Sequence, residues 1–426
     1  MVTLSQKQLQ RLRVIEKAVD GRLSVSEAAH LLLRSERQVQ RLKRRFQPDS
    51  TDWLLHGNSG RVMPWALQPE VRHQIVVLAR TRYAGFNDSH FHQKLVEQEG
   101  FSLSRESVRR ILRAAGLHSP QKRRPRKYRA RRQRRPRFGL MLLTDASRHD
   151  WLQQRGPRLT LFGFQDDATS RVLAAHFQLE PENSLGYFRL LQQLVARHGI
   201  PLSLYRDRHS IFQRNDPHWS VAEELAGQQF PPQVGRALDE LGIQQIPAQS
   251  PQAKGRIERL WRTFQDRLIS ELRLAGATTC DQANQVLEHF VADYNQRFAV
   301  PPRHAESDFR RLSRGFDLAR CLSFRYQRVV APDHTIVFGN ERIQLPPARF
   351  AYTRSTVELS HQLDGQLRIY RGPQLLLSIQ RPLHELMEPK PAIRSAAQKR
   401  KRKPPASMPT AAEKLSPLHR ELLTQR

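Results

Sequence analysis

Apolar residues near the N-terminus recur at helical spacing, with polar residues at the points where helices would begin. Leu9, Ile15 and Val19 fall along one side of a helix. Farther along, Ser24 and Ser35 each precede a Glu or Gln by three residues, which is the spacing of a helix-capping box. Two short helices separated by a tight turn are therefore expected after the first helix.

The last of these predicted helices separates an apolar face, formed by Val39, Leu42 and Phe46, from a polar and basic one. The second helix of a helix-turn-helix presents such polar side chains to the major groove of DNA. Residues 1–50 are therefore predicted to form a helix-turn-helix DNA-binding domain, although a plain three-helix bundle with a solvated basic face would show the same pattern. The predicted DNA contacts are Arg37, Gln38, Arg41, Arg44 and Arg45.

A second helix-turn-helix domain is predicted over residues 65–118. Its helices are expected at Glu70–Arg82, His90–Glu99 and Ser104–Ala115. Gly116 is placed to end the last of them. On that helix the apolar side chains are predicted to point inward and Arg105, Arg109 and Arg113 outward, the first two as DNA contacts. Two such domains in tandem would bind an extended DNA site.

Residues 138–302 change to short apolar runs that alternate with helical patterns. Strands are expected in FGLMLLTD, RLTLFGFQDDATSR, RVLAAHF, PLSLYRD and GIQQIPA, and helices at Asn183–His198, Gly235–Leu241, Ile257–Arg273 and Asp281–Arg297. Three consecutive strands followed by alternating helices and strands predict an α/β domain, a mixed sheet covered by helices.

The remaining segments differ in composition. Residues 320–382 contain β-rich runs with turn signals at Gly339-Asn340 and Asp364-Gly365, which predict a small β-barrel. Residues 119–137 hold 11 basic residues and almost nothing apolar, so they are expected to be a linker that follows the DNA backbone. Residues 388–426 are Pro-rich and basic and are expected to be a disordered, DNA-contacting tail.

The net charge of the chain indicates what kind of partner it binds. In 426 residues, Lys and Arg number 71 against 40 acidic residues, a net charge of +31. Such an excess favours a polyanionic partner, and nucleic acid is the usual one, with a ribosome-associated or membrane-surface protein as the alternative. Together with the helix-turn-helix patterns, the charge favours double-stranded DNA. Two cysteines are too few for a disulfide framework or a cysteine-based zinc site. With no secretion signal and no long apolar run, the protein is expected in the cytoplasm, associated with the nucleoid and not with a membrane.

Three acidic residues occupy matching positions in the central domain. Asp145 is predicted to end the first strand and Asp207 the fourth, and these strands are neighbours in a sheet of this connectivity. Glu258 begins the helix whose apolar stripe would pack across the same rim. Any one strand-terminal Asp is more often a turn former, so the prediction depends on the set of three. Asp166 and Asp167 are interpreted as turn and capping residues instead.

Three carboxylates at one point repel each other unless a cation lies between them. Mg²⁺ is the natural cation, because it binds a few carboxylate oxygens and keeps positions for water and phosphate. Two such ions, about 3.5–4 Å apart, would suit an in-line phosphoryl displacement, and Mn²⁺ could replace them. Asp145, Asp207 and Glu258 are therefore the predicted metal ligands and catalytic residues.

At these residues the sequence resembles the ISNCY-type insertion-sequence transposases, within the retroviral-integrase-like superfamily. The resembling segments are LLTDASRHDWL, FQDDATSR, LYRDRHSIF, SPQAKGRIERLWRTFQDRLISELRLAG and DYNQRFAVPP. The resemblance implies a ribonuclease-H-like fold over 138–302 and a DDE triad formed by Asp145, Asp207 and Glu258. It also implies phosphate contacts by Lys254 and Arg256. The 50 residues between the second and third acid exceed the retroviral spacing, and the retroviral HHCC zinc module is missing.

The resemblance implies a DNA transposase that cuts the ends of an insertion sequence and joins the new 3′-OH to target DNA. The partners would be terminal inverted repeats, target DNA and further copies of the chain in a homo-oligomer assembled on DNA. One alternative is a catalytically silent, sequence-specific DNA-binding regulator derived from a transposase. Another is a simple hydrolytic nuclease, although two helix-turn-helix domains would be of little use to it.

Overall fold

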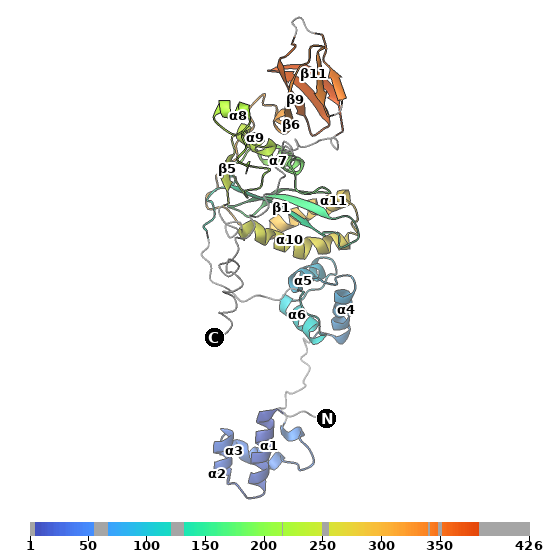
Figure 1. The fold of residues 1–426 in the computed structure, drawn as a ribbon. Coiled ribbons are helices and arrows are strands. Elements are labelled where there is room, and N and C mark those ends of the chain that lie inside the picture. Colours follow the sequence, from blue (N-terminus) through green and yellow to red (C-terminus); the bar gives the residue numbers. More distant parts are fainter. Residues whose placement is uncertain are drawn as a thin grey trace, which may run out of the picture. The chain divides into compact units, whose positions relative to one another are not determined.

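The structure, a computed structural model, describes residues 5–54, 67–120, 132–214, 216–248, 255–339, 341–347 and 352–382 (Figure 1). The chain divides into two compact units, residues 1–78 and 79–426, and the boundary falls inside helix α4 (Pro69–Arg80). The predicted tail over 388–426 and most of the predicted linker over 119–137 lie outside the described residues. None of the described helices is long and apolar enough to span a membrane.

The first unit begins with the three helices that the sequence predicts. They are α1 (Gln6–Val19), α2 (Val25–Leu32) and α3 (Glu36–Arg45), followed by the short turn η1 (Asp52–Leu54). Both predicted capping boxes are confirmed. The Ser24 and Ser35 hydroxyls accept the backbone N–H three residues later, and the backbone N–H of each serine donates to the side chain of Glu27 or Gln38. These caps satisfy N–H groups that a helix start leaves unpaired.

The buried stripe of α1 differs from the predicted one. Val14, Ile15 and Ala18 are buried, whereas Leu9 and Val19 are 40% and 41% exposed. Helix α1 contacts both α2 and α3, and the few buried side chains that these helices offer, Ala28, Ala29 and Val39, cluster with Val14, Ile15 and Ala18. The periodicity therefore predicts the helix correctly but not which of its residues are buried.

Helices α5 (Asp88–Glu97) and α6 (Arg105–Ala114) confirm two of the helices predicted over 65–118. Gly116 ends α6 in a left-handed conformation with φ of +74°, as predicted. The outward orientation predicted for Arg113 is wrong. Its guanidinium lies 2.5 Å from the Asp88 carboxylate and also donates to the Leu117 carbonyl, because an acidic side chain at the start of α5 faces it.

The central sheet is mixed, as predicted. Its strands are β1 (Leu142–His149), β2 (Leu159–Asp166), β3 (Val172–Gln178), β4 (Ser203–Arg206) and β5 (Gln244–Pro247). They lie in the order β3-β2-β1-β4-β5, with β1 antiparallel to β2 and parallel to β4. The prediction that Asp145 ends β1 is wrong, because β1 pairs with β2 as far as His149 while its pairing with β4 stops at Leu143.

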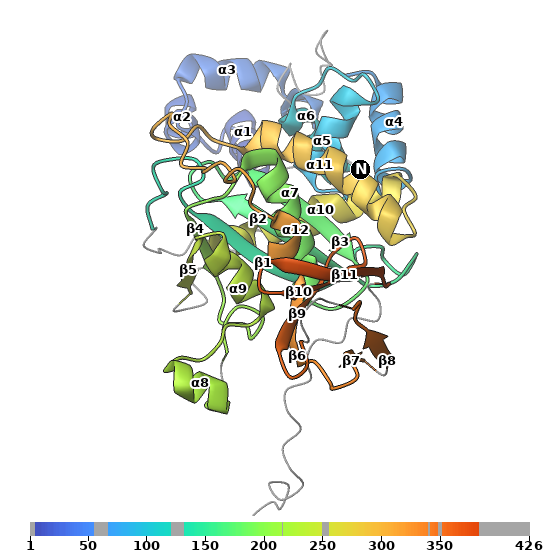
Figure 2. The same ribbon diagram turned by 90° about the horizontal axis from the view of Figure 1, so that it is seen from above.

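Four helices cover the sheet, two on each face (Figure 1). Helices α7 (Ser184–His198) and α9 (Gln233–Glu240) bury their apolar sides against one face, and α10 (Gly255–Leu274) and α11 (Cys280–Phe298) cover the other. All four are predicted within about two residues of their ends. A short helix that the sequence did not predict, α8 (Val221–Ala226), stands off from the sheet (Figure 2).

Two asparagines of α11 bind the outer strand β3. The Asn295 side chain accepts from the backbone N–H of Val172 and donates to its carbonyl, at 2.8 and 2.7 Å. Asn284 forms the same pair with Phe177, at 2.7 and 3.1 Å. Because buried backbone groups need partners, these amides allow α11 to lie against the strand.

The C-terminal strands form two sheets within the described residues. The strands are β6 (Phe324–Val329), β7 (Thr335–Phe338), β8 (Glu341–Gln344), β9 (Thr356–His361), β10 (Gln366–Arg371) and β11 (Gln374–Gln380), preceded by the short helix α12 (Leu318–Cys321). One sheet has the order β11-β10-β9-β6, and β7 pairs with β8. Both predicted hairpins are confirmed, and closure into a barrel stays a prediction.

His176 of β3 makes the stability of the central domain sensitive to acid. Its ring stacks on Phe162 at 5.2 Å, and neither ring nitrogen has a hydrogen-bond partner within the described part of the chain. Burial, assisted by the charge of Arg189, lowers the pKa of His176 to about 4. The folded protein therefore excludes a proton that the unfolded chain binds below about pH 6.5.

We expect the free energy of unfolding to fall as the pH drops from about 6.5 towards 4, because the lowered pKa favours the neutral ring in the folded state. The loss from His176 should reach about 2 kcal/mol at pH 5. Urea unfolding at pH 7 and pH 5 would measure it, and His176→Leu should abolish this share of the loss. An equal pH dependence in the variant would contradict the assignment.

Candidate active site

Asp145 lies in the middle of β1, on the face that α10 covers. It pairs with Gly163 of β2, and its carboxylate Oδ2 accepts a hydrogen bond of 3.1 Å from the indole Nε1–H of Trp261 on α10. A Cβ at Gly163 would come within 2.9 Å of the Trp261 ring. The glycine therefore provides the space in which the indole crosses the sheet and reaches Asp145.

Asp207 immediately follows β4, the strand parallel to β1. Leu142 pairs with Leu204 and Leu143 with Tyr205, so two further residues along both strands lead to Asp145 and Asp207. Both aspartates are half-buried. The Asp207 carboxylate accepts the backbone N–H of His209 at 3.1 Å, which turns the chain away from the sheet. The parallel register thus brings these two predicted residues onto neighbouring strands.

Glu258 lies in the first turn of α10 and is exposed. It precedes Trp261 by three residues, so the two side chains project from the same side of the helix. A carboxylate in the first turn also faces the positive end of the helix dipole. Glu258 is therefore carried by the helix that contacts Asp145.

The three predicted acids do not form one closed metal site in the structure. Within the described residues, no group of three or more His, Cys, Asp or Glu side chains is placed to hold a metal ion. Asp145 and Asp207 occupy neighbouring strands, and Glu258 stays at the solvent-exposed start of its helix. Like charges disfavour close approach of such side chains.

A further carboxylate, Glu182, belongs to this neighbourhood, although nothing in the sequence singled it out. It precedes α7, and its Oε1 accepts a 2.6 Å hydrogen bond from the Tyr187 hydroxyl. Burial raises the pKa of Glu182, and the negative charges of Asp207 and Asp145 raise it further. Glu182 lies in the polar loop LEPENS, where only the fold reveals its proximity to the two aspartates.

Comparison with known proteins agrees with the resemblance seen in the sequence. An integrase core domain model matches residues 240–297, which include β5 and α10. The protein named "Putative transposase y4bF" from Sinorhizobium fredii is 36% identical over 346 residues, covering 81% of this chain and 74% of that protein. The transposase for insertion sequence IS1202 from Streptococcus pneumoniae is 30% identical, covering 77% and 76%.

The chain belongs to the insertion-sequence transposases of the DDE/integrase superfamily. Among solved structures, a chain from the simian T-cell lymphotropic virus intasome in complex with PP2A regulatory subunit B56 gamma aligns with 72% of the transposase and 96% of its own length. Its identity is 13% and its TM-score 0.30, so the family assignment depends on the sequence relatives.

Asp166 of the transposase has the turn-forming role predicted for it. Its carboxylate accepts the backbone N–H groups of Gly139 and Thr169, at 3.0 and 2.8 Å, and the Thr169 hydroxyl at 2.6 Å. Such bonds close the turn between β2 and β3.

Asp167 has a role other than the predicted turn-forming or capping one. It is fully buried and forms ion pairs with Arg132, at the end of the basic segment, and Arg256, in the first turn of α10. Its carboxylate also accepts the backbone N–H of Arg135 at 2.8 Å. One carboxylate therefore holds two segments that lie 124 residues apart, and Arg256 in addition donates to the Arg132 carbonyl at 2.6 Å.

The predicted DNA contacts of the transposase are placed as follows. All five on α3 are exposed, and Gln38 also takes part in the capping box. Arg105 and Arg109 on α6 are exposed, the latter 3.2 Å from Glu106. Lys254 lies outside the described residues. Arg256 is paired with Asp167, so a contact with phosphate would require it to exchange partners. All of these contacts stay predictions.

Proposed function

We propose that this transposase cuts the ends of its insertion sequence and joins the new 3′-OH to target DNA, with Asp145, Asp207 and Glu258 as its acidic triad. The observation that supports the proposal is the hydrogen bond from Trp261 to Asp145. It holds α10 against β1, the strand that carries Asp145, and β1 is paired with β4, the strand that Asp207 follows.

The donor chemistry suits a divalent cation. Carboxylate oxygens are the ligands that Mg²⁺ prefers, with Mn²⁺ as a substitute. Asp145 and Asp207 would hold the metal, and Glu258 would complete the set. A bound divalent ion, or a pair of them, would supply Lewis-acid stabilisation of the charge that develops on the phosphate oxygens.

Each residue of the transposase would then have a defined task. Trp261 orients the Asp145 carboxylate through its N–H group. The turn at His209 fixes Asp207 where β4 leaves the sheet. Asp167 holds the start of α10, and with it Glu258, through Arg256. Catalysis of phosphoryl transfer depends mostly on such positioning and on electrostatic stabilisation.

The distribution of charge supports DNA as the substrate. The net charge of +31 would be neutralised by phosphates with release of counterions. The exposed arginines of α3 and α6 would bind the terminal inverted repeats. Because two ends must be joined to one target, we propose that several copies of the transposase assemble on DNA.

The experiment uses purified transposase, labelled duplexes carrying the inverted repeats that flank its coding region, and a target plasmid. With Mg²⁺ we expect cleavage that leaves a 3′-OH, followed by products joined to the plasmid. Cleavage without joining would favour a hydrolytic nuclease. Specific binding to the repeats without cleavage would favour a silent DNA-binding regulator.

A further inference from the structure

Helix α5 of the second helical region packs against the last turns of α10, the helix that begins with Glu258. Several hydrogen bonds and ion pairs connect α5 and the residue before it to helices α10 and α11. The pairs are Asn87 with Asp266, Gln93 with Arg267, His90 and Lys94 with Glu271, and Glu97 with Arg297. We call this set of contacts the α5–α10 joint.

Glu271 is at the centre of the joint. Its carboxylate lies 2.6 Å from His90 Nε2 and 2.8 Å from Lys94 Nζ. His90 and Lys94 are four residues apart, so they share one face of α5. They are 1% and 8% exposed. A buried charge that loses its partner is strongly unfavourable, so Glu271 and Lys94 hold each other in place.

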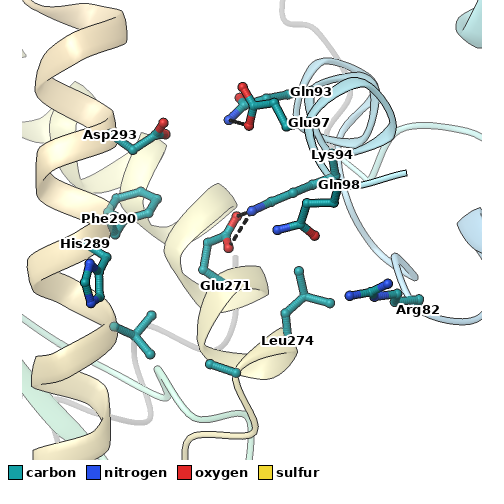
Figure 3. A pocket seen from close by; sticks show the side chains of 12 residues that line it. Arg82, Gln93, Lys94, Glu97, Gln98, Glu271, Leu274, His289, Phe290 and Asp293 are labelled. Atoms are coloured by element: carbon teal, nitrogen blue, oxygen red, sulfur yellow. Dashed lines mark hydrogen bonds and ion pairs between the residues drawn. The ribbon is translucent and has the colours of Figure 1, made fainter. Parts of the chain in front are cut away.

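An open pocket lies beside this ion pair. A cavity of about 450 Å³ lies between α5, α10 and α11, lined among others by Lys94, Glu271, Phe290 and Asp293 (Figure 3). Figure 3 shows Lys94 reaching across from α5 to Glu271. The ion pairs and hydrogen bonds of the joint therefore bridge α5 and α10 beside an open pocket.

The joint connects the helical region that carries predicted DNA contacts to the helix that carries the predicted catalytic glutamate. Arg113 pairs with Asp88 and so fixes α6 to α5, while Arg105 and Arg109 of α6 remain exposed. On the other side, Glu258 and Glu271 lie on one continuous helix, which places them about 20 Å apart. The joint therefore links a basic helix to the predicted catalytic glutamate through rigid elements.

We propose that the α5–α10 joint fixes the distance between DNA bound by α6 and the start of α10, and so determines which phosphate reaches Glu258. DNA bound by α6 is held at a fixed distance from the start of α10, and Glu271, His90 and Lys94 are the positioning residues that fix that distance. This inference rests on the proposed function, because it assumes that α6 binds the DNA end. Opening the joint would leave DNA binding intact but would let the cleavage position vary.

The test maps the DNA that lies beside residue 258 without using catalysis. In a full-length variant with Glu258→Cys, Cys280→Ser and Cys321→Ser, iron-EDTA is attached at position 258, and hydroxyl-radical scission of a labelled end duplex is recorded. We expect a narrow band of scission at one distance from the bound repeat. Adding Glu271→Lys or Lys94→Glu should spread the band over several more nucleotides, with the Kd for the end changed less than about threefold.

The exchanged pair Lys94→Glu with Glu271→Lys should narrow the band again, because opposite charges face each other once more. Glu288→Lys is the matched control, since Glu288 is exposed on α11 and pairs with Arg197 outside the joint. Glu271→Gln keeps the shape of the side chain and serves if the reversed charges unfold the protein. A narrow, unshifted band in Glu271→Lys, Lys94→Glu and Glu271→Gln would overturn the proposal.

The same probe separates this inference from the proposed function. If the chain lacks strand transfer in Mg²⁺ yet gives a narrow band that broadens in the single variants, the joint stands and the catalytic proposal fails. If the parent protein shows transfer while the band is broad in the labelled protein without a substitution in the joint, the proposed function stands and the proposal for the joint fails.

Discussion

Asp207→Asn is expected to reduce strand transfer by about a thousandfold or more, equivalent to about 4 kcal/mol of transition-state stabilisation. Asparagine keeps the size of the side chain and can still accept the backbone N–H of His209. It removes the negative charge that the proposed divalent ion requires. Because Asp207 is not among the predicted DNA contacts, binding to DNA ends should remain unchanged. Strand-transfer assays and gel shifts on the same preparation would measure both quantities.

Asp150→Asn is the matched control for this substitution. Asp150 also follows the strand that carries Asp145, but its carboxylate accepts the Gln154 backbone N–H in a local turn, which asparagine can do as well. Its activity should remain within about twofold of the parent. Asp145→Asn and Glu258→Gln should match the loss in Asp207→Asn, because residues that act as a unit fail together. Undiminished transfer by Asp207→Asn would place the chemistry elsewhere in the chain.

Asp167→Asn is expected to lower the free energy of unfolding of the central domain by about 3 kcal/mol. The substitution leaves the guanidinium groups of Arg132 and Arg256 without their shared buried counter-charge. Arg256 is the more affected partner, since its side chain is only 16% exposed. Arg256 precedes Glu258 by two residues, so the first turn of α10 should loosen as well. Strand transfer should therefore fall about tenfold or more, even at a temperature where the variant remains folded.

Urea unfolding followed by circular dichroism would measure the loss of stability. Asp364→Asn provides the comparison, because Asp364 accepts the Gln366 backbone N–H in an exposed turn and asparagine retains that bond. Its unfolding midpoint should hardly change. If Asp167→Asn were as stable as Asp364→Asn, Asp167 would not be the anchor that the ion pairs suggest.

The order of the five strands and four long helices of the central domain could be predicted from the sequence, because most of them show a clear helical period or a short apolar run. Strand β2 and helix α10 are examples, one a short, mostly apolar run and the other a regular apolar stripe from Ile257 to Leu268. The position of Asp207 at the end of β4 also followed from local pattern. The neighbouring places of β1 and β4 followed from general rules of sheet topology.

Contacts between distant segments could not be predicted in this way. The extension of β1 beyond Asp145 depends on its pairing with β2, which local periodicity does not encode. The resemblance implies a phosphate contact by Arg256, and the ion pair of Arg256 with the buried Asp167 carboxylate is a contact that local pattern does not encode. Glu182 reaches the two aspartates only through the turn between β3 and α7.

The amides of Asn284 and Asn295 have a consequence for how copies of the chain can associate. An uncovered outer strand offers a row of N–H and C=O groups onto which a foreign strand can add, extending the sheet from one molecule into the next. On β3 those groups at Val172 and Phe177 are already occupied by side chains of the same molecule. Growth by strand addition is therefore blocked at two points along this border, which protects a highly concentrated or newly made protein from sheet-to-sheet aggregation.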